Sequence, residues 1–132
     1  LDMDRYMEAR MTIESVKEIL AAQLLCGQDR QHEDVCSACG SDLMSDVLAF
    51  VKRDTVLLTG LTNPQVVRTA EMLDMNVIVI VRGKSVPPAT LEMAISRNMV
   101  LLCTQYTLFE ACGRLYQAGL RGVNDRQEGP EK

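Results

Sequence analysis

Five segments of the chain place apolar residues every three or four positions, the spacing that puts them on one face of a helix. Residues suited to capping or starting a helix stand at or near their beginnings: Thr12, Ser41 or Asp42, Asn63-Pro64, Pro87-Pro88 and Thr107. The pattern predicts helices over 12–22, 41–51, 63–74, 87–95 and 107–119. Apolar runs of strand length lie between them and predict strands over 24–27, 35–39, 55–60, 77–81 and 99–103.

The later predicted strands are apolar on both faces and alternate with helices. The run Val77-Ile78-Val79-Ile80-Val81, for example, is β-branched throughout and has no polar face. This alternation is typical of a parallel sheet that helices cover on both sides. We therefore expect an α/β fold: a single three-layer α/β/α domain with a mostly parallel sheet, over residues 11–120. The first helix and the two early strands should add to one edge.

The two ends of the chain are interpreted separately. Residues 1–10 form an N-terminal extension, either foreign to the native chain or helical. Residues 121–132 are polar, contain Gly and Pro, and are predicted as a frayed tail.

Composition limits the class of protein. A chain of 132 residues with 47% hydrophobic residues fits one domain whose core needs neither disulfides nor a metal. Its net charge of −4 argues against binding to nucleic acid or to an anionic membrane surface. No apolar run approaches the roughly 20 residues that span a bilayer, and no signal-peptide pattern opens the chain. Five cysteines, mostly in apolar segments, favour a reducing compartment, so we expect a cytoplasmic protein.

The candidate site follows from the expected sheet. In open parallel sheets, ligands bind beyond the carboxyl ends of the strands, where helix N-termini converge. Four strand-to-helix turns, around 40–42, 59–63, 82–85 and 104–107, should meet there and offer hydroxyls, amides, cations and backbone N–H groups suited to a phosphate or carboxylate. The candidate ligand-binding residues are Ser41, Asp42, Thr59, Gly60, Thr62, Asn63, Arg82, Gly83, Lys84, Thr104, Tyr106 and Thr107.

Helix capping alone also explains the Ser, Thr and Asn residues of these turns. Capping does not require Arg82 and Lys84, although a solvated charge after a buried strand is common. No turn carries the phosphate loop G-x-x-x-x-G-K-[ST] or the dinucleotide fingerprint G-x-G-x-x-G, and the one histidine, His32, lies in a polar loop. We therefore expect no enzyme activity, no catalytic residues, no cofactor and no metal site.

Cys36 and Cys39 form a C-x-x-C pair, which raises the alternative of a thiol redox or metal-binding protein. Structural zinc sites usually need a second such pair, and the sequence has none. A thioredoxin-like pair begins a helix, whereas Cys36 falls within the predicted strand over 35–39. The two side chains would also point to opposite faces of a regular strand, so we interpret them as packing residues.

From Ser41 to Leu120 the order and spacing of segments resemble the DRTGG domain family. The likeness lies in S-D-L-M-S-D-V-L-A-F, L-L-T-G-L-T-N-P-Q-V-V-R-T-A-E-M-L-D, V-I-V-I-V-R-G-K and Y-T-L-F-E-A-C-G-R-L-Y. Such domains are accessory domains in some phosphotransacetylases and CBS-containing pyrophosphatases. This chain is most similar to the small stand-alone members, some associated with iron-only hydrogenase genes. The name-giving residues are only partly kept: Gly60-Leu61-Thr62-Asn63 stands for Gly-Asp-Arg-Thr, and Arg82-Gly83 for Gly-Gly.

The resemblance implies a fold like the N-terminal domain of HPr kinase, usually homodimeric, with a ligand-sensing or assembly role rather than catalysis. We hypothesise a regulatory, non-catalytic domain that binds a small anionic ligand, such as a nucleotide or a phosphorylated metabolite, with Arg82 and Lys84 supplying positive charge. Two alternatives stay open. One is the thiol protein, which fits a link to hydrogenase systems. The other is a protein-interaction module without a small ligand, whose partner belongs to a hydrogenase or signalling context.

Overall fold

A computed structural model describes residues 10–48 and 54–122 of the chain. Its centre is a six-stranded sheet in the order β2-β7-β6-β5-β4-β8, and a separate two-stranded ladder joins β1 to β3. The elements of the main sheet are β2 (Gln23–Cys26), β4 (Ser37–Gly40), β5 (Thr55–Thr59), β6 (Val77–Ile80), β7 (Val100–Cys103) and β8 (Arg121–Gly122). The small ladder consists of β1 (Met11–Thr12) and β3 (Asp34–Val35). Every pairing in the main sheet is parallel except that of β2 with β7, which confirms the mostly parallel sheet.

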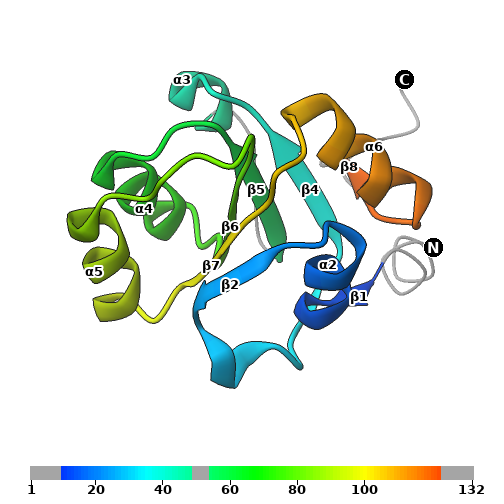
Figure 1. The fold of residues 1–132 in the computed structure, drawn as a ribbon, viewed down its shortest axis with the longest axis horizontal. Coiled ribbons are helices and arrows are strands. Elements are labelled where there is room, and N and C mark those ends of the chain that lie inside the picture. Colours follow the sequence, from blue (N-terminus) through cyan, green and yellow to red (C-terminus); the bar gives the residue numbers. More distant parts are fainter. Residues whose placement is uncertain (1–9, 49–53, 123–132) are drawn as a thin grey trace.

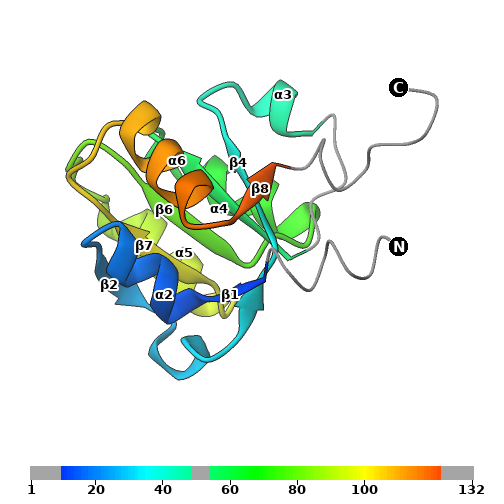
Figure 2. The same cartoon turned by 90° about the vertical axis from the view of Figure 1, so that its right-hand side faces the viewer.

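Helices cover both faces of the sheet (Figure 1). The helices α2 (Ile13–Ile19) and α6 (Leu108–Gln117) pack against each other on one face, and α4 (Pro64–Met72) and α5 (Pro88–Ser96) do so on the other. The short helix α3 (Met44–Val47) follows β4, and a 3-10 turn, η1 (Gln28–Arg30), precedes β3. Figure 2 shows α2 and α6 on one side of the strands. The predicted three-layer α/β/α fold is therefore confirmed.

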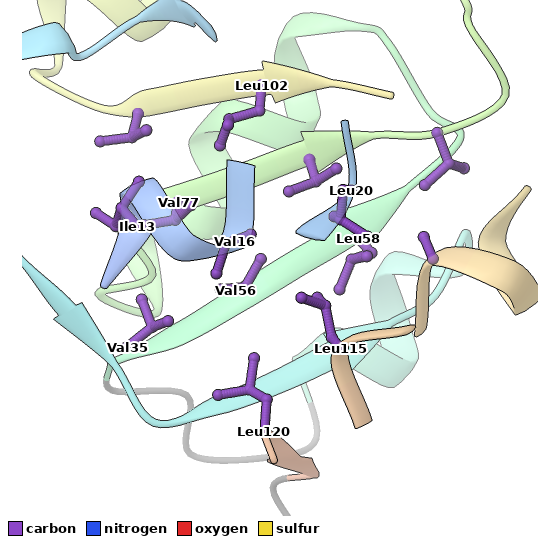
Figure 3. Close-up of a cluster of buried hydrophobic side chains, with 14 residues drawn as sticks. Ile13, Val16, Leu20, Val35, Val56, Leu58, Val77, Leu102, Leu115 and Leu120 are labelled. Atoms are coloured by element: carbon purple, nitrogen blue, oxygen red, sulfur yellow. The ribbon is translucent and has the colours of Figure 1, made fainter. Parts of the chain in front are cut away.

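Alternation along the central strands divides the core into two layers. Val56 and Leu58 of β5 belong to the layer beneath α2 and α6, whereas Leu57 belongs to the layer beneath α4 and α5. Figure 3 shows the first layer, in which Ile13 of α2 and Leu115 of α6 contribute to the same cluster as the strands. Full burial of such a side chain contributes roughly 1.5–3 kcal/mol. Because both faces are covered, every residue of β5 and β6 is buried, as the apolar runs predicted.

The early strands depart from the prediction in two ways. The expected strand over 35–39 is divided, because β3 pairs with β1 while β4 enters the main sheet, and Cys36 lies between them. The early strands also do not share one edge: β2 lies beside β7, and β4 lies on the other side of the sheet beside β5. Apolar periodicity fixes which residues of a strand are buried, but it does not fix strand order.

Three further boundaries differ from the prediction. The helix over 41–51 shortens to α3, and its last predicted residues, 49–51, lie outside the described residues. The predicted tail begins too early, because Arg121–Gly122 form β8 and pair with β4, although 123–132 also lie outside the described residues. Residues 1–9 of the predicted N-terminal extension also lie outside the described residues. The pairing of β1 with β3 was not predicted. Two-residue strands carry no periodicity, so the sequence pattern cannot show them. In the described part of the chain, no helix is long and apolar enough to cross a bilayer.

Candidate functional site

The predicted turns do come together at the carboxyl ends of β4, β5, β6 and β7, and we call this edge the rim. Gly60, which follows β5, is its centre. The Gly60 N–H donates to Asp42 Oδ1 over 2.6 Å, and the Thr59 hydroxyl donates to the same oxygen over 3.0 Å. The Gly60 carbonyl accepts from Lys84 Nζ at 2.8 Å. Side chains from two neighbouring turns therefore hold the turn between them.

The next pair of turns is joined through the backbone. The Arg82 N–H donates to the Tyr106 carbonyl over 2.7 Å, and the Gly83 N–H donates to the Thr104 carbonyl over 2.8 Å. Both Arg82 and Gly83 have left-handed φ angles, 66° and 62°. Glycine favours this conformation at 83, and a Cβ there would also require the end of the Gln105 side chain to move. Arg82 adopts the same conformation without that freedom, at a cost of roughly 1–2 kcal/mol for a residue with a Cβ.

The strained backbone at Arg82 delivers its side chain to the centre of the rim. A Cβ built on Gly60 would lie 3.3 Å from Arg82 Nη2 and 3.3 Å from Asp42 Oδ2, so both charged groups border the same glycine. Arg82 is exposed, and no residue in the described ranges forms a hydrogen bond or an ion pair with its guanidinium. This cation is therefore available to a ligand, whereas the Lys84 ammonium already holds the Gly60 carbonyl.

Several of the predicted site residues form hydrogen bonds with other parts of the chain. The Ser41 hydroxyl makes a local turn, accepting from the Leu43 N–H over 3.0 Å. The buried Thr104 hydroxyl donates to the Leu20 carbonyl over 2.7 Å. Thr107 caps α6 by accepting from the Glu110 N–H, as predicted. The prediction that Ser41 or Asp42 caps the following helix is wrong, since the cap position of α3 is Leu43 and no side chain caps it.

The beginning of α4 contrasts with these capped helices. Asn63 occupies the predicted cap position, but its side chain makes no capping hydrogen bond, and Pro64 follows as the first helical residue. The Thr62 carbonyl accepts from the buried Thr90 hydroxyl over 2.6 Å, which ties this turn to α5. The exposed Asn63 amide therefore adds a polar group to the rim, and the helix dipole adds a partial positive charge at the beginning of α4.

Tyr106 has a different role from the polar residues. Its ring is half-buried against the core layer under α6, and the Arg114 guanidinium stacks 4.2 Å from the ring centroid. Sequence reasoning left two rim residues out of the site: Gln105, whose amide lies over Gly83, and Thr90. Gln105 could have been found from its place in a predicted turn, whereas Thr90 lies inside a predicted helix and gave no signal.

The cysteines do not gather into a second site. Cys36 is fully buried, and no group of three or more metal-ligating side chains occurs among the residues that the structure describes. Burial raises the pKa of the Cys103 thiol, and burial followed by the nearby Cys39 raises the pKa of the Cys112 thiol. Cys112 instead packs on β4, where its Sγ lies 2.6 Å from the position of a Cβ on Gly40. Thiols with raised pKa values are poor nucleophiles and poor metal ligands at neutral pH.

Comparison with solved structures finds a related fold. The chain is similar to the CBS and DRTGG domains of the regulatory region of Clostridium perfringens pyrophosphatase, a structure solved with the activator diadenosine tetraphosphate. The TM-score is 0.68 at 12% sequence identity, and the match covers 89% of this chain and 50% of that one. This chain thus spans half the length of that neighbour. No family model and no curated protein matches the sequence. The likeness supports the DRTGG-like fold, and evidence for a function has to come from the geometry of the rim.

Proposed function

We propose that this chain is a non-catalytic regulatory domain that senses a small anionic ligand, such as a nucleotide or a phosphorylated metabolite, at the rim. The observation that carries the proposal is the exposed Arg82 guanidinium. It stands beside Gly60 on a left-handed backbone and has no partner within the described residues.

Three features support an anionic ligand. A guanidinium recognises phosphate through charged, often bidentate hydrogen bonds. The beginning of α4, which no side chain caps, adds the positive end of a helix dipole close in sequence to Gly60. The structurally similar pyrophosphatase region binds a nucleotide activator, so nucleotides are the first ligands to test. At 12% identity that likeness supports the fold, and the anionic character of the proposed ligand rests on Arg82.

The test compares two variants that lose the same charge at different places. Arg82→Ala removes the rim cation, and Arg97→Ala removes a cation at the end of α5, where Arg97 pairs with Glu71. Adenosine mono-, di- and triphosphates, diadenosine tetraphosphate and pyrophosphate are screened by thermal shift, and hits are measured by calorimetry at fixed ionic strength. A ligand at 100 times its Kd should stabilise the fold by about 2.7 kcal/mol.

We expect Arg82→Ala to weaken binding about tenfold or more, because a hydrogen bond to a charged group contributes roughly 1.5–3 kcal/mol. Arg97→Ala should bind like the wild type. If the two variants bind equally, Arg82 does not recognise the ligand and the rim proposal is wrong. If no anion stabilises the wild-type protein, the sensing role itself is rejected.

The proposal also includes a homodimer, as the family resemblance implies, and a cytoplasmic location. The location is supported by the five cysteines, all of which are described and none of which forms a disulfide. Light scattering over a concentration series tests the dimer. A monomer at every concentration would remove that part and leave the anion site to be judged separately.

A further inference from the structure

Asp42 uses its carboxylate in an unusual way for a residue that precedes a helix. It does not cap α3; it reaches to the β5–α4 turn, where its Oδ1 accepts from both the Gly60 N–H and the Thr59 hydroxyl. A backbone N–H next to a hydroxyl, at the end of a parallel strand, is the kind of donor pair that holds a phosphate oxygen. Here the chain's own carboxylate occupies those donors.

The surroundings of the carboxylate are those of an anion site. Asp42 Oδ2 and Arg82 Nη2 are each 3.3 Å from the position of a Cβ on Gly60, yet no ion pair joins the two side chains. The guanidinium is thus close to an anion-holding position without being neutralised by a direct contact. A phosphate group bound at Gly60 could meet the same two donors and the guanidinium together.

The segment that carries Asp42 is held by few contacts: the Ser41 N–H donates to the Leu58 carbonyl over 3.0 Å, and Met44 packs against the core layer under α4 and α5. α3 has four residues, of which only Val47 is buried, and no side chain caps it. Ser41 bonds to Leu43 within its own turn. Among the described residues, the Asp42 carboxylate makes the side-chain hydrogen bonds that join this segment to the β5–α4 turn. Removing Asp42 from Gly60 would release α3 more readily than any element of the central sheet.

We propose that Asp42 is a built-in competitor of the anionic ligand. In the free protein its carboxylate occupies the phosphate position at Gly60 and Thr59. The ligand's phosphate displaces it, pairs with Arg82, and frees α3, whose movement reports occupancy of the rim. This inference rests on the proposed function, since it assigns the regulation of the same site.

The experiment removes one negative charge at two positions of the same segment. Asp42→Asn keeps the size of the side chain and a neutral acceptor for Gly60, and neutral acceptors bind more weakly than carboxylates. Asp46→Asn is the matched control, because Asp46 lies exposed within α3 and its carboxylate forms no hydrogen bond or ion pair with the rim among the described residues. Binding of pyrophosphate and of adenosine diphosphate is measured by calorimetry at constant ionic strength.

We expect Asp42→Asn to bind both anions about tenfold more tightly than the wild type, and Asp46→Asn to bind like the wild type. If Asp42→Asn binds no more tightly than Asp46→Asn while Arg82→Ala still loses binding, the competitor inference is overturned and the proposed function stands. If neither the wild type nor Asp42→Asn binds either anion, both fail.

A measurement on the wild-type protein tests the same inference without a substitution, so its result does not depend on whether a variant folds. Hydrogen exchange of the Val47 and Leu48 amides, which bond within the α3 turn, is followed by NMR with and without saturating adenosine diphosphate. Faster exchange of these amides in the complex, with β5 unchanged, supports displacement of Asp42. Unchanged or slower exchange in a saturated complex overturns it.

Discussion

Replacing Arg82 by glycine separates the energetic cost of its left-handed backbone from the role of its guanidinium. Arg82 has a φ of 66°, a conformation that costs a residue with a Cβ roughly 1–2 kcal/mol. Glycine adopts it freely but loses more conformational entropy on folding, a difference of roughly 0.5–1 kcal/mol. Since the exposed guanidinium has no partner in the described part of the protein, its removal should cost no native interaction. Arg82→Gly is therefore expected to raise the free energy of unfolding by about 0.5–1 kcal/mol.

Urea denaturation followed by circular dichroism measures the change, and thermal unfolding should show a midpoint about 2–4 °C higher. Arg82→Ala is the control, because alanine loses the charge but keeps the strained backbone. Its stability should stay within about 0.5 kcal/mol of the wild type. Both variants should lose anion binding to the same degree, so stability would rise while function falls.

A less stable Arg82→Gly would refute this reasoning. It would mean that the guanidinium contributes to the native state, and that Arg82 is retained for the fold rather than for a ligand. An Arg82→Gly protein that binds anions as tightly as the wild type would refute the functional half alone.

Two further predictions concern the framework of the rim, and a third concerns the Arg30–Glu33 pair just before β3. Gly40→Ala should destabilise the fold by about 1–3 kcal/mol, because the new methyl group meets Cys112 Sγ, and adding Cys112→Ala should restore part of the loss in urea denaturation. Thr104→Val should cost about 1–3 kcal/mol by leaving a buried carbonyl without its donor, yet calorimetry should show unchanged anion affinity. The Arg30 guanidinium, through its hydrogen bonds, holds the pKa of Glu33 below its ordinary value, so this pair stabilises the fold at neutral pH and loses its effect as pH falls through the lowered pKa. Glu33→Gln should therefore lower stability near pH 7 by less than about 1 kcal/mol, and urea titrations should show the difference vanishing in acid.

Much of the fold could be predicted because the central strands are buried on both faces. The β-branched run from Val77 to Val81 admits few other interpretations, and parallel strands bring their carboxyl ends to one edge by geometry alone. The location of the rim was therefore predictable from the sequence. Thr107 was predictable as a cap, because capping depends on residues three positions away.

The interactions within the rim could not be predicted in the same way. The local sequence predicts Asp42 as a helix cap. Only the folded chain shows that its carboxylate accepts from the N–H of Gly60, 18 residues further on. Arg82 gives no sequence signal of a left-handed φ, since that conformation is common only for glycine and, less so, asparagine and aspartate. The position of β4 across the sheet from β2 depends on long-range pairing, which no local pattern encodes.

The most direct test of the rim as an anion site is a titration of the isotopically labelled wild-type protein with adenosine diphosphate, followed by NMR at fixed ionic strength. The account predicts saturable shifts of the Gly60, Arg82 and Gly83 amides, with those of β1 and β3 at the opposite end unchanged. Shifts that avoid these three amides, or none at any concentration, would contradict it.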